Sequence, residues 1–121
     1  MARLFRDDVP IAVAEIARTH AQRRRGLLGR DPMPEVLVMP ATSVHTIGMR
    51  SPLDVAFCRL RPGAMADALD ALPVELHVDS VATMPPGRLS RPRWRERIVL
   101  EAPAGSWRRL DVRAGDRLVL R

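Results

Sequence analysis

Residues 43–60, SVHTIGMRSPLDVAFCRL, hold the pattern that decides the fold. In its second half, Val55 and Phe57 point to one side of an extended chain, and the other apolar residues, Ala56, Cys58 and Leu60, point to the opposite side. A strand that is apolar on both faces is typical of the covered centre of a sheet. Pro52 restricts how the chain enters this strand. We therefore expect residues 54–60 to form a central, buried strand.

Short strand patterns recur about every ten residues along the chain, with turn residues between them. We expect strands over residues 3–6, 11–17, 35–40, 54–60, 74–83, 97–102, 108–112 and 116–121. Thr19 and Gln22 have the spacing of a capping box, which predicts a short helix within residues 19–30. Alanine and leucine favour a second short helix within residues 64–72. The predicted fold is mainly β: one domain, residues 1–121, with sandwich-like or barrel-like antiparallel sheets and one or two short helices.

The composition indicates a small globular protein with a positive charge. Hydrophobic residues make up 46% of the 121 residues, and the 20 basic residues are all arginine, for a net charge of +6. The arginine bias fits phosphate recognition, but the favoured interpretation is a GC-rich bacterial genome. A single cysteine, Cys58, excludes an intramolecular disulfide. The amino terminus lacks a signal-peptide pattern and no apolar run reaches the ~20 residues of a membrane span, so we expect a cytoplasmic protein without a membrane partner.

Three blocks of sequence are shared with a known family. They are RRRGLLGR at residues 23–30, GMRSPLDVAF at 48–57, and IVLEAPAG followed by AGDRL within 98–118. Together they resemble the domain-of-unknown-function family 192, small single-domain proteins of bacteria and archaea. The resemblance implies a mainly β, sandwich-like fold with a short helix, and it implies no established reaction. Compared with the family, residues 61–73 are expected to be an insertion in a connection between two strands.

The stretch before the central strand contains a candidate ligand groove. Its residues are His45, Arg50 and Asp54. Histidine titrates near neutral pH, and arginine can hold a carboxylate or a phosphate. His45 and Asp54 could serve as a general base and its orienting group, but no nucleophile or glycine-rich phosphate loop accompanies them. The favoured interpretation is a structural corner, in which Asp54 accepts backbone N–H bonds or pairs with an arginine. The same corner would form one wall of a small polar groove.

The segment RPRWRERIVLE suggests a surface for polyanions. The candidate polyanion face consists of Arg91, Arg93, Trp94, Arg95 and Arg97. In an extended chain its four arginines lie on one side and Trp94 on the other. Arginines that follow a phosphate backbone, with an aromatic ring for stacking, are typical of nucleic-acid binding. The favoured alternative is a solvated strand edge whose charges prevent edge-to-edge pairing.

Other reactive residue types form no recognised motif. The candidate metal ligands are His45, His77 and Asp79. No HExxH, CxxC or close histidine pair is present, so we expect no metal site and no cofactor. Cys58 is expected to be buried and inert. Glu101, in the third family block, is expected to pair with an arginine of residues 23–25.

The sequence therefore leads to one main functional prediction and two alternatives. The main prediction is an uncharacterised, non-enzymatic binding or accessory module of the family-192 type, with a groove at His45, Arg50 and Asp54 for a protein or a small anionic ligand. The first alternative is binding of nucleic acid or another polyanion through the arginine-rich face, with an affinity that falls steeply with salt. The second is an enzyme of unknown reaction at His45 and Asp54, with a perturbed histidine pKa in a pocket.

Overall fold

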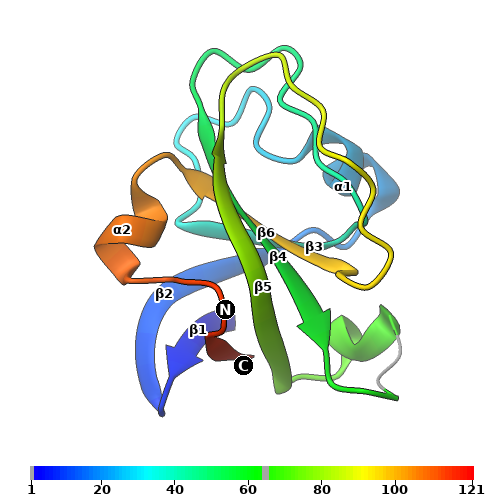
Figure 1. The fold of residues 1–121 in the computed structure, drawn as a ribbon, viewed down its shortest axis with the longest axis vertical. Helices are drawn as coiled ribbons and strands as arrows, with labels where there is room; N and C mark the ends of the chain where they lie inside the picture. Colours follow the sequence, from blue (N-terminus) through cyan, green and yellow to red (C-terminus); the bar gives the residue numbers. More distant parts are fainter. Residues whose placement is uncertain (1, 64–65) are drawn as a thin grey trace.

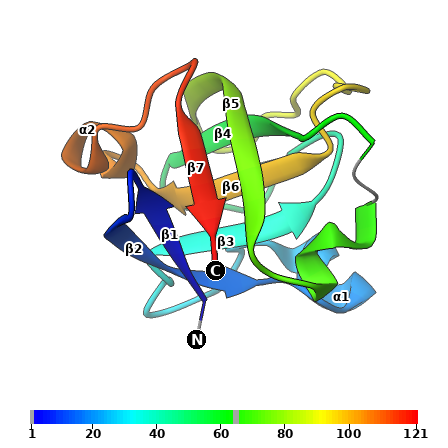
Figure 2. The same ribbon diagram turned by 90° about the horizontal axis from the view of Figure 1, so that it is seen from below.

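The computed structural model describes residues 2–63 and 66–121 and shows a closed barrel of seven strands (Figures 1 and 2). The strands are β1 (Ala2–Arg6), β2 (Val9–Ile16), β3 (Val36–Pro40), β4 (Leu53–Leu60), β5 (Val74–Met84), β6 (Ile98–Pro103) and β7 (Arg117–Leu120). The helices are α1 (His20–Arg25) and α2 (Ser106–Leu110), and η1 (Ala66–Asp70) is a short 3-10 helix. The prediction of a mainly β domain is confirmed, and of its two alternatives, sandwich-like and barrel-like, the structure is the barrel.

The barrel is mixed, whereas the sequence pattern predicted antiparallel sheets. Its strand order is β1-β2-β3-β6-β4-β5-β7, and β7 closes the barrel by pairing with β1. The pair of β2 and β3 is parallel, and every other pair is antiparallel. The connection between β2 and β3 carries α1, so it is long enough to return the chain to the same end before β3 starts. Local strand patterns contain no information about this crossover.

The strand β4 lies between β5 and β6 and is buried on both faces, as its pattern predicted. Ala56 and Cys58 belong to a core with residues from all seven strands, which is the barrel interior. Val55 and Phe57 point outwards into a second core. The chain between β2 and β4 covers this second core, with Leu27 and Val44 among the covering residues.

One expected strand is a helix. Residues 108–112 were predicted to be extended, but α2 occupies Ser106–Leu110. The helix begins where Gly105 adopts a positive φ of 92°, and the Trp107 backbone N–H donates to the Asp54 carboxylate at 2.9 Å. This hydrogen bond comes from a residue 53 positions away in the chain, so a local pattern cannot reveal it.

The two predicted helical segments have different outcomes. The capping box of α1 is present: the Gln22 backbone N–H donates to Thr19 Oγ1, and the Thr19 backbone N–H donates to Gln22 Oε1, both at 3.0 Å. The second segment overlaps residues 64 and 65, which lie outside the described residues, and its described part contains η1. The proposed insertion of residues 61–73 stays a prediction. In the described part of the chain, no helix has the length and apolar character needed to cross a membrane.

Candidate functional site

Glu101 is a carboxyl side chain on the outer face of the barrel, beneath the second core. Alternate residues of β6 point into the barrel, so Glu101 shares the outward direction of Val99. Its neighbours on the adjacent strands are Leu37 of β3 and Val55 of β4, both buried and apolar. Glu101 is only 4% exposed, and neither of these two paired neighbours is polar. Such a placement is costly for a carboxyl group unless a partner compensates it.

The fold leaves half of this carboxyl without a partner. Glu101 Oε1 is buried and has no hydrogen-bond partner among the described residues. Burial raises the pKa of Glu101 to about 7, and a hydrogen bond from the Leu27 backbone partly opposes that rise. The expected ion pair with an arginine of residues 23–25 is not formed. The prediction of that pair was wrong. Arg25 donates to the Leu28 carbonyl oxygen instead, and Arg23 and Arg24 do not come within ion-pair distance of the carboxyl.

Gly26, directly after α1, passes close to the carboxyl. A Cβ at this position would lie 2.7 Å from Glu101 Oε1, and the backbone φ is +54°. The positive φ favours glycine here, and a larger residue would also force the carboxyl to shift. The close approach of Gly26 seals one side of the carboxyl and leaves its other side open to a pocket.

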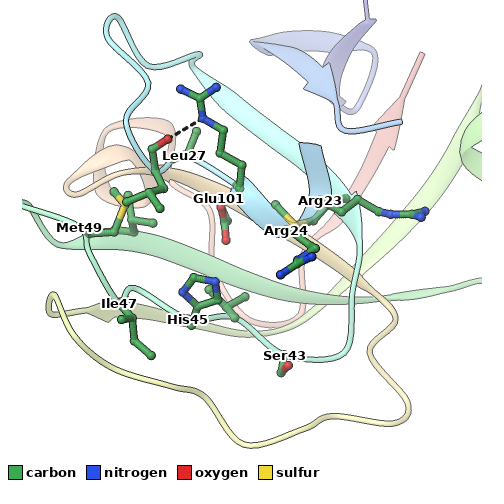
Figure 3. A pocket seen from close by; sticks show the side chains of 14 residues that line it. Arg23, Arg24, Leu27, Ser43, His45, Ile47, Met49 and Glu101 are labelled. Carbon is green, nitrogen blue, oxygen red and sulfur yellow. Dashed lines mark hydrogen bonds between the residues drawn. The ribbon is translucent and has the colours of Figure 1, made fainter. Parts of the chain in front are cut away.

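Glu101 lines a pocket of about 40 Å³ between α1, the outer barrel wall and the segment before β4. The wall is apolar and includes Leu27, Met39, Val44 and Leu53, and the rim carries His45 and arginines of α1. Figure 3 shows the side chains of Glu101 and His45 turned toward one another across the pocket. The pocket thus combines a buried acid with basic groups at its mouth.

The arginines of α1 differ in the contacts that their side chains make. Arg25 donates from Nε to the Leu28 carbonyl oxygen at 2.9 Å, so it stabilises the turn that follows α1. Arg23 and Arg24 form no ion pair or side-chain hydrogen bond with any residue in the described ranges. In Figure 3 Arg24 extends toward His45 and the pocket, whereas Arg23 points away from it. Arg24 is therefore the guanidinium available at the mouth.

An irregular two-stranded ribbon positions His45. The segment before β4 runs beside the loop before β6 (Figure 1), with backbone bonds from Thr46 to Arg88 and from Ser90 to Val44, both 2.8 Å. Thr46 is fully buried, and its hydroxyl donates to the Pro85 carbonyl at 2.5 Å and accepts from the Arg88 backbone at 2.9 Å. Because neighbouring residues of a ribbon face opposite sides, burying Thr46 turns exposed His45 outwards to the pocket rim.

A protein-family model matches nearly the whole chain, which shows the family to which the chain belongs. A model of the DUF192 family, described as "Uncharacterized ACR", matches residues 4–120. The chain belongs to this family. No reaction is attached to that description, so membership of DUF192 assigns no chemistry to the pocket.

Two solved structures share the fold of this DUF192 protein. A protein described as a "putative transcription regulator" from Sinorhizobium meliloti 1021 is similar at 21% identity with a TM-score of 0.65, over 97% of this chain and 89% of that one. A protein of unknown function from Novosphingobium aromaticivorans DSM 12444 is similar at 19% identity with a TM-score of 0.62, over 97% and 81% of the two chains. No curated protein matches the chain. At these identities the likeness shows the fold alone.

The three residues of the groove expected in this DUF192 chain lie in different places. His45 lines the Glu101 pocket, whereas Arg50 lines a separate, wider hollow beside Gly48 and Met49. Asp54 is 2% exposed and lines neither of them. Its Oδ1 accepts from Thr83 Oγ1 at 2.7 Å and its Oδ2 accepts from the Trp107 backbone N–H. Asp54 therefore accepts a backbone N–H, as the structural-corner interpretation predicted.

The wider hollow is a weaker candidate. Its volume is about 600 Å³, and it is lined by residues such as Arg30, Asp31 and Arg50. Arg30 is already paired with Glu15, with its Nη1 at 2.6 Å from Oε2, and this contact lowers the pKa of Glu15. None of the buried side-chain atoms that lack a hydrogen-bond partner in the described residues belongs to this hollow.

The candidate polyanion face is not an extended strand. Residues 91–97 lie before β6, and Arg93 turns inwards, with its Cζ 4.3 Å from the centre of the Phe57 ring. Trp94 is 74% exposed, and the other arginines of the face, Arg91, Arg95 and Arg97, are also exposed. Arg93 therefore belongs to the packing of the outer core, and three arginines and one tryptophan remain on the surface.

The other candidates from the sequence, His77, Asp79 and Cys58, contact neighbouring side chains or are buried. Asp79 pairs with Arg59 at 2.6 Å, and His77 Nε2 lies 3.6 Å from Glu75 Oε1. Across residues 2–63 and 66–121, no three side chains of His, Cys, Asp or Glu are grouped to hold a metal ion. Cys58 is buried, and burial, with a smaller effect of Asp79, raises the pKa of its thiol to about 12. A thiol with so high a pKa is a poor nucleophile.

Sequence reasoning noticed Glu101 but missed its role. The signal available was a single acid within IVLEAP, a strand whose other positions are apolar on both faces. An acid at such a position has no solvent side to point to. Its pocket depends on Gly26 and Val44, which are far from it in the sequence.

Proposed function

We propose that this DUF192 protein is a non-enzymatic binding module whose ligand site is the pocket around Glu101. The observation that supports this most is the buried Oε1 of Glu101, which has no hydrogen-bond partner in residues 2–63 and 66–121, on a side chain that lines an open pocket. A buried acceptor without a partner costs about 1–3 kcal/mol, so a ligand that supplies a donor recovers that free energy. His45 and Arg24 at the rim provide further polar contacts (Figure 3).

The binding function has more support than catalysis by His45 and Asp54. Both carboxylate oxygens of Asp54 accept hydrogen bonds from Thr83 and Trp107, so Asp54 is used by the fold. His45 consequently has no carboxylate orienter in Asp54. Of the serine, cysteine and lysine side chains that could act as a nucleophile, the pocket lining contains only Ser43, at its edge. The groups present fit recognition of a ligand.

A thermal-shift screen tests this function. Small carboxylates, amines, amides, sugars and nucleotides are added to the wild type, to Glu101→Gln and to Arg108→Gln. Arg108 is an exposed residue of α2 outside the pocket, so its variant controls for a substitution to glutamine elsewhere on the molecule. A ligand at 100 times its dissociation constant adds about 2.7 kcal/mol to the free energy of unfolding. We expect at least one class to raise the midpoint of the wild type and of Arg108→Gln, with a smaller rise in Glu101→Gln. Equal shifts in all three proteins would contradict a site at Glu101.

A second candidate function rests on the exposed tryptophan. Trp94 is the most exposed large apolar side chain in the described part of the chain, and it lies next to Arg95 in the sequence. An exposed aromatic ring among arginines favours stacking with the bases of a single-stranded nucleic acid. This candidate predicts binding that is lost at higher salt.

A further inference from the structure

The pocket around Glu101 accepts only a small group. Its volume is about 40 Å³, compared with about 600 Å³ for the wider hollow beside Arg50. The buried carboxyl lies among Leu27, Met39 and Leu53, so the group that enters is surrounded by apolar side chains except on the carboxyl side. Only the tip of a ligand can enter, and the rest must lie at the mouth.

The entering tip must be a hydrogen-bond donor. Glu101 Oε1 is an acceptor without a partner among the described residues, and Gly26, which lies against it, has no side chain that could donate to it. Ammonium is the donor that matches best, because a cation beside a buried carboxylate compensates its charge as well as its hydrogen-bonding capacity. A neutral donor would satisfy the oxygen and leave the charge uncompensated.

The mouth of the pocket favours an anionic group on the ligand, whereas its interior favours a cationic one. Arg24 extends toward the pocket (Figure 3) and forms no ion pair with a described residue, and the whole chain carries a net charge of +6. A ligand that is only a cation would be repelled at this entrance. A ligand that also carries a carboxylate or a phosphate can meet the guanidinium of Arg24 with a charge-assisted hydrogen bond.

We infer that the ligand of this site is a small zwitterion, with a primary ammonium group that enters to Glu101 and an anionic group that stays at the mouth beside Arg24 and His45. The inference rests on the proposed binding function and names the ligand class for the same pocket. Amino acids and amino-alcohol phosphates both have this chemistry. The two sources differ in the anion that meets Arg24.

Isothermal titration with a matched set of probes tests the class. The probes are γ-aminobutyrate, butyrate, which lacks the ammonium group, and butylamine, which lacks the carboxylate. Phosphoethanolamine distinguishes a phosphate from a carboxylate at the mouth. We expect a zwitterion to bind at least about tenfold more tightly than butyrate and butylamine, a difference of about 1.4 kcal/mol. Concentrations up to about ten millimolar cover the weak affinities expected of so small a ligand.

Variants connect the affinity to the two ends of the ligand. Glu101→Gln keeps the shape of the side chain and removes its charge, so it should reduce the affinity for the zwitterion about tenfold or more and leave butyrate unaffected. Arg24→Gln should reduce the affinity for the zwitterion by a similar factor and leave the affinity for butylamine unaffected. Arg108→Gln, on the exposed face of α2, should bind like the wild type.

The outcomes separate the ligand class from the function. Butyrate that binds as tightly as the best zwitterion, with an affinity that Glu101→Gln lowers, would overturn the zwitterion and keep the binding function. The same holds for an uncharged sugar or amide that binds in a Glu101-dependent way. Absence of binding for every probe and every class in the thermal-shift screen would overturn both proposals.

Discussion

Glu101 is a carboxyl group that the fold removes from water without giving it a full set of partners. Its neighbours on β3, β4 and β6 are apolar, and the Leu27 backbone supplies the one hydrogen bond that lowers its pKa. A neutral or apolar residue of similar size would fit beneath the second core at a lower cost in free energy than a charged carboxylate. The charge makes physical sense if a cationic partner binds at the pocket.

The elevated pKa of Glu101 predicts a dependence of stability on pH. Because the folded state holds the proton up to about pH 7 and the unfolded state only to the ordinary value of 4.5, the stabilising effect is complete below pH 4.5 and is lost as the pH rises through 7. Relative to Glu101→Gln, the wild type should lose roughly 3 kcal/mol at most between these pH values. Urea unfolding of both proteins at pH 5 and pH 8 measures the difference, in which other titrating groups cancel. Parallel pH profiles would contradict the buried, unpaired state of Glu101.

Asp54 should behave as a structural acceptor. Asp54→Ala removes the bonds from Thr83 and Trp107 and should lower the free energy of unfolding by about 3 kcal/mol. Asp54→Asn should cost only about 1 kcal/mol, because its amide can accept from the Trp107 N–H and donate to the Thr83 hydroxyl. Chemical denaturation checks both values. A stable Asp54→Ala protein that has lost ligand binding would contradict this role and support Asp54 as a member of the site.

Among the elements, α1 depends on its cap more than on packing. It has six residues, none of them buried, and the turn after it is held by Arg25 and by the backbone bond from Gly26 to Gln22. An isolated helix of this length is unstable in water. The capping box of Thr19 and Gln22 therefore sets the position from which Arg24 reaches the pocket.

Removal of the cap tests this dependence. Thr19→Ala should lower the free energy of unfolding by about 1 kcal/mol, because the Gln22 backbone N–H loses its acceptor. Thr19→Ser keeps a hydroxyl and should stay within a few tenths of the wild type. Urea denaturation gives the free energies, and hydrogen exchange at the Gln22 amide reports the helix locally. Unchanged exchange in Thr19→Ala would show that packing, and not the cap, holds α1.

At the scale of the whole molecule, the net charge is +6. The loop before β6 and the ribbon beside it carry exposed arginines together with the exposed side chains of Ile47, Leu89 and Trp94. Arg93 is excluded from this surface by its contact with the Phe57 ring. A polyanion would therefore meet Arg91, Arg95 and Arg97 around Trp94.

The polyanion candidate predicts a salt effect tied to this surface. Binding of a short single-stranded oligonucleotide should weaken linearly with the logarithm of the salt concentration, with a slope of about −0.7 per phosphate contact. The triple variant Arg91/Arg95/Arg97→Gln should reduce that slope, whereas Arg108/Arg109/Arg117→Gln, an equal change of charge at exposed residues elsewhere, should retain most of it. Fluorescence anisotropy at several salt concentrations measures both. Equal losses in the two variants would indicate attraction to net charge alone and would exclude a defined face.

The sequence by itself determined the elements whose signals are local. The β4 pattern predicted a strand buried on both faces, and Thr19 with Gln22 predicted the cap of α1, because side-chain alternation and capping act within a few residues. It also determined the DUF192 family, through blocks spread along the chain. Only the tertiary structure decided what depends on contacts between distant residues. These are the closure of β7 on β1, the parallel pairing after α1, the helix that Asp54 supports at Trp107, and the pocket in which Gly26 and His45 surround the buried carboxyl of Glu101.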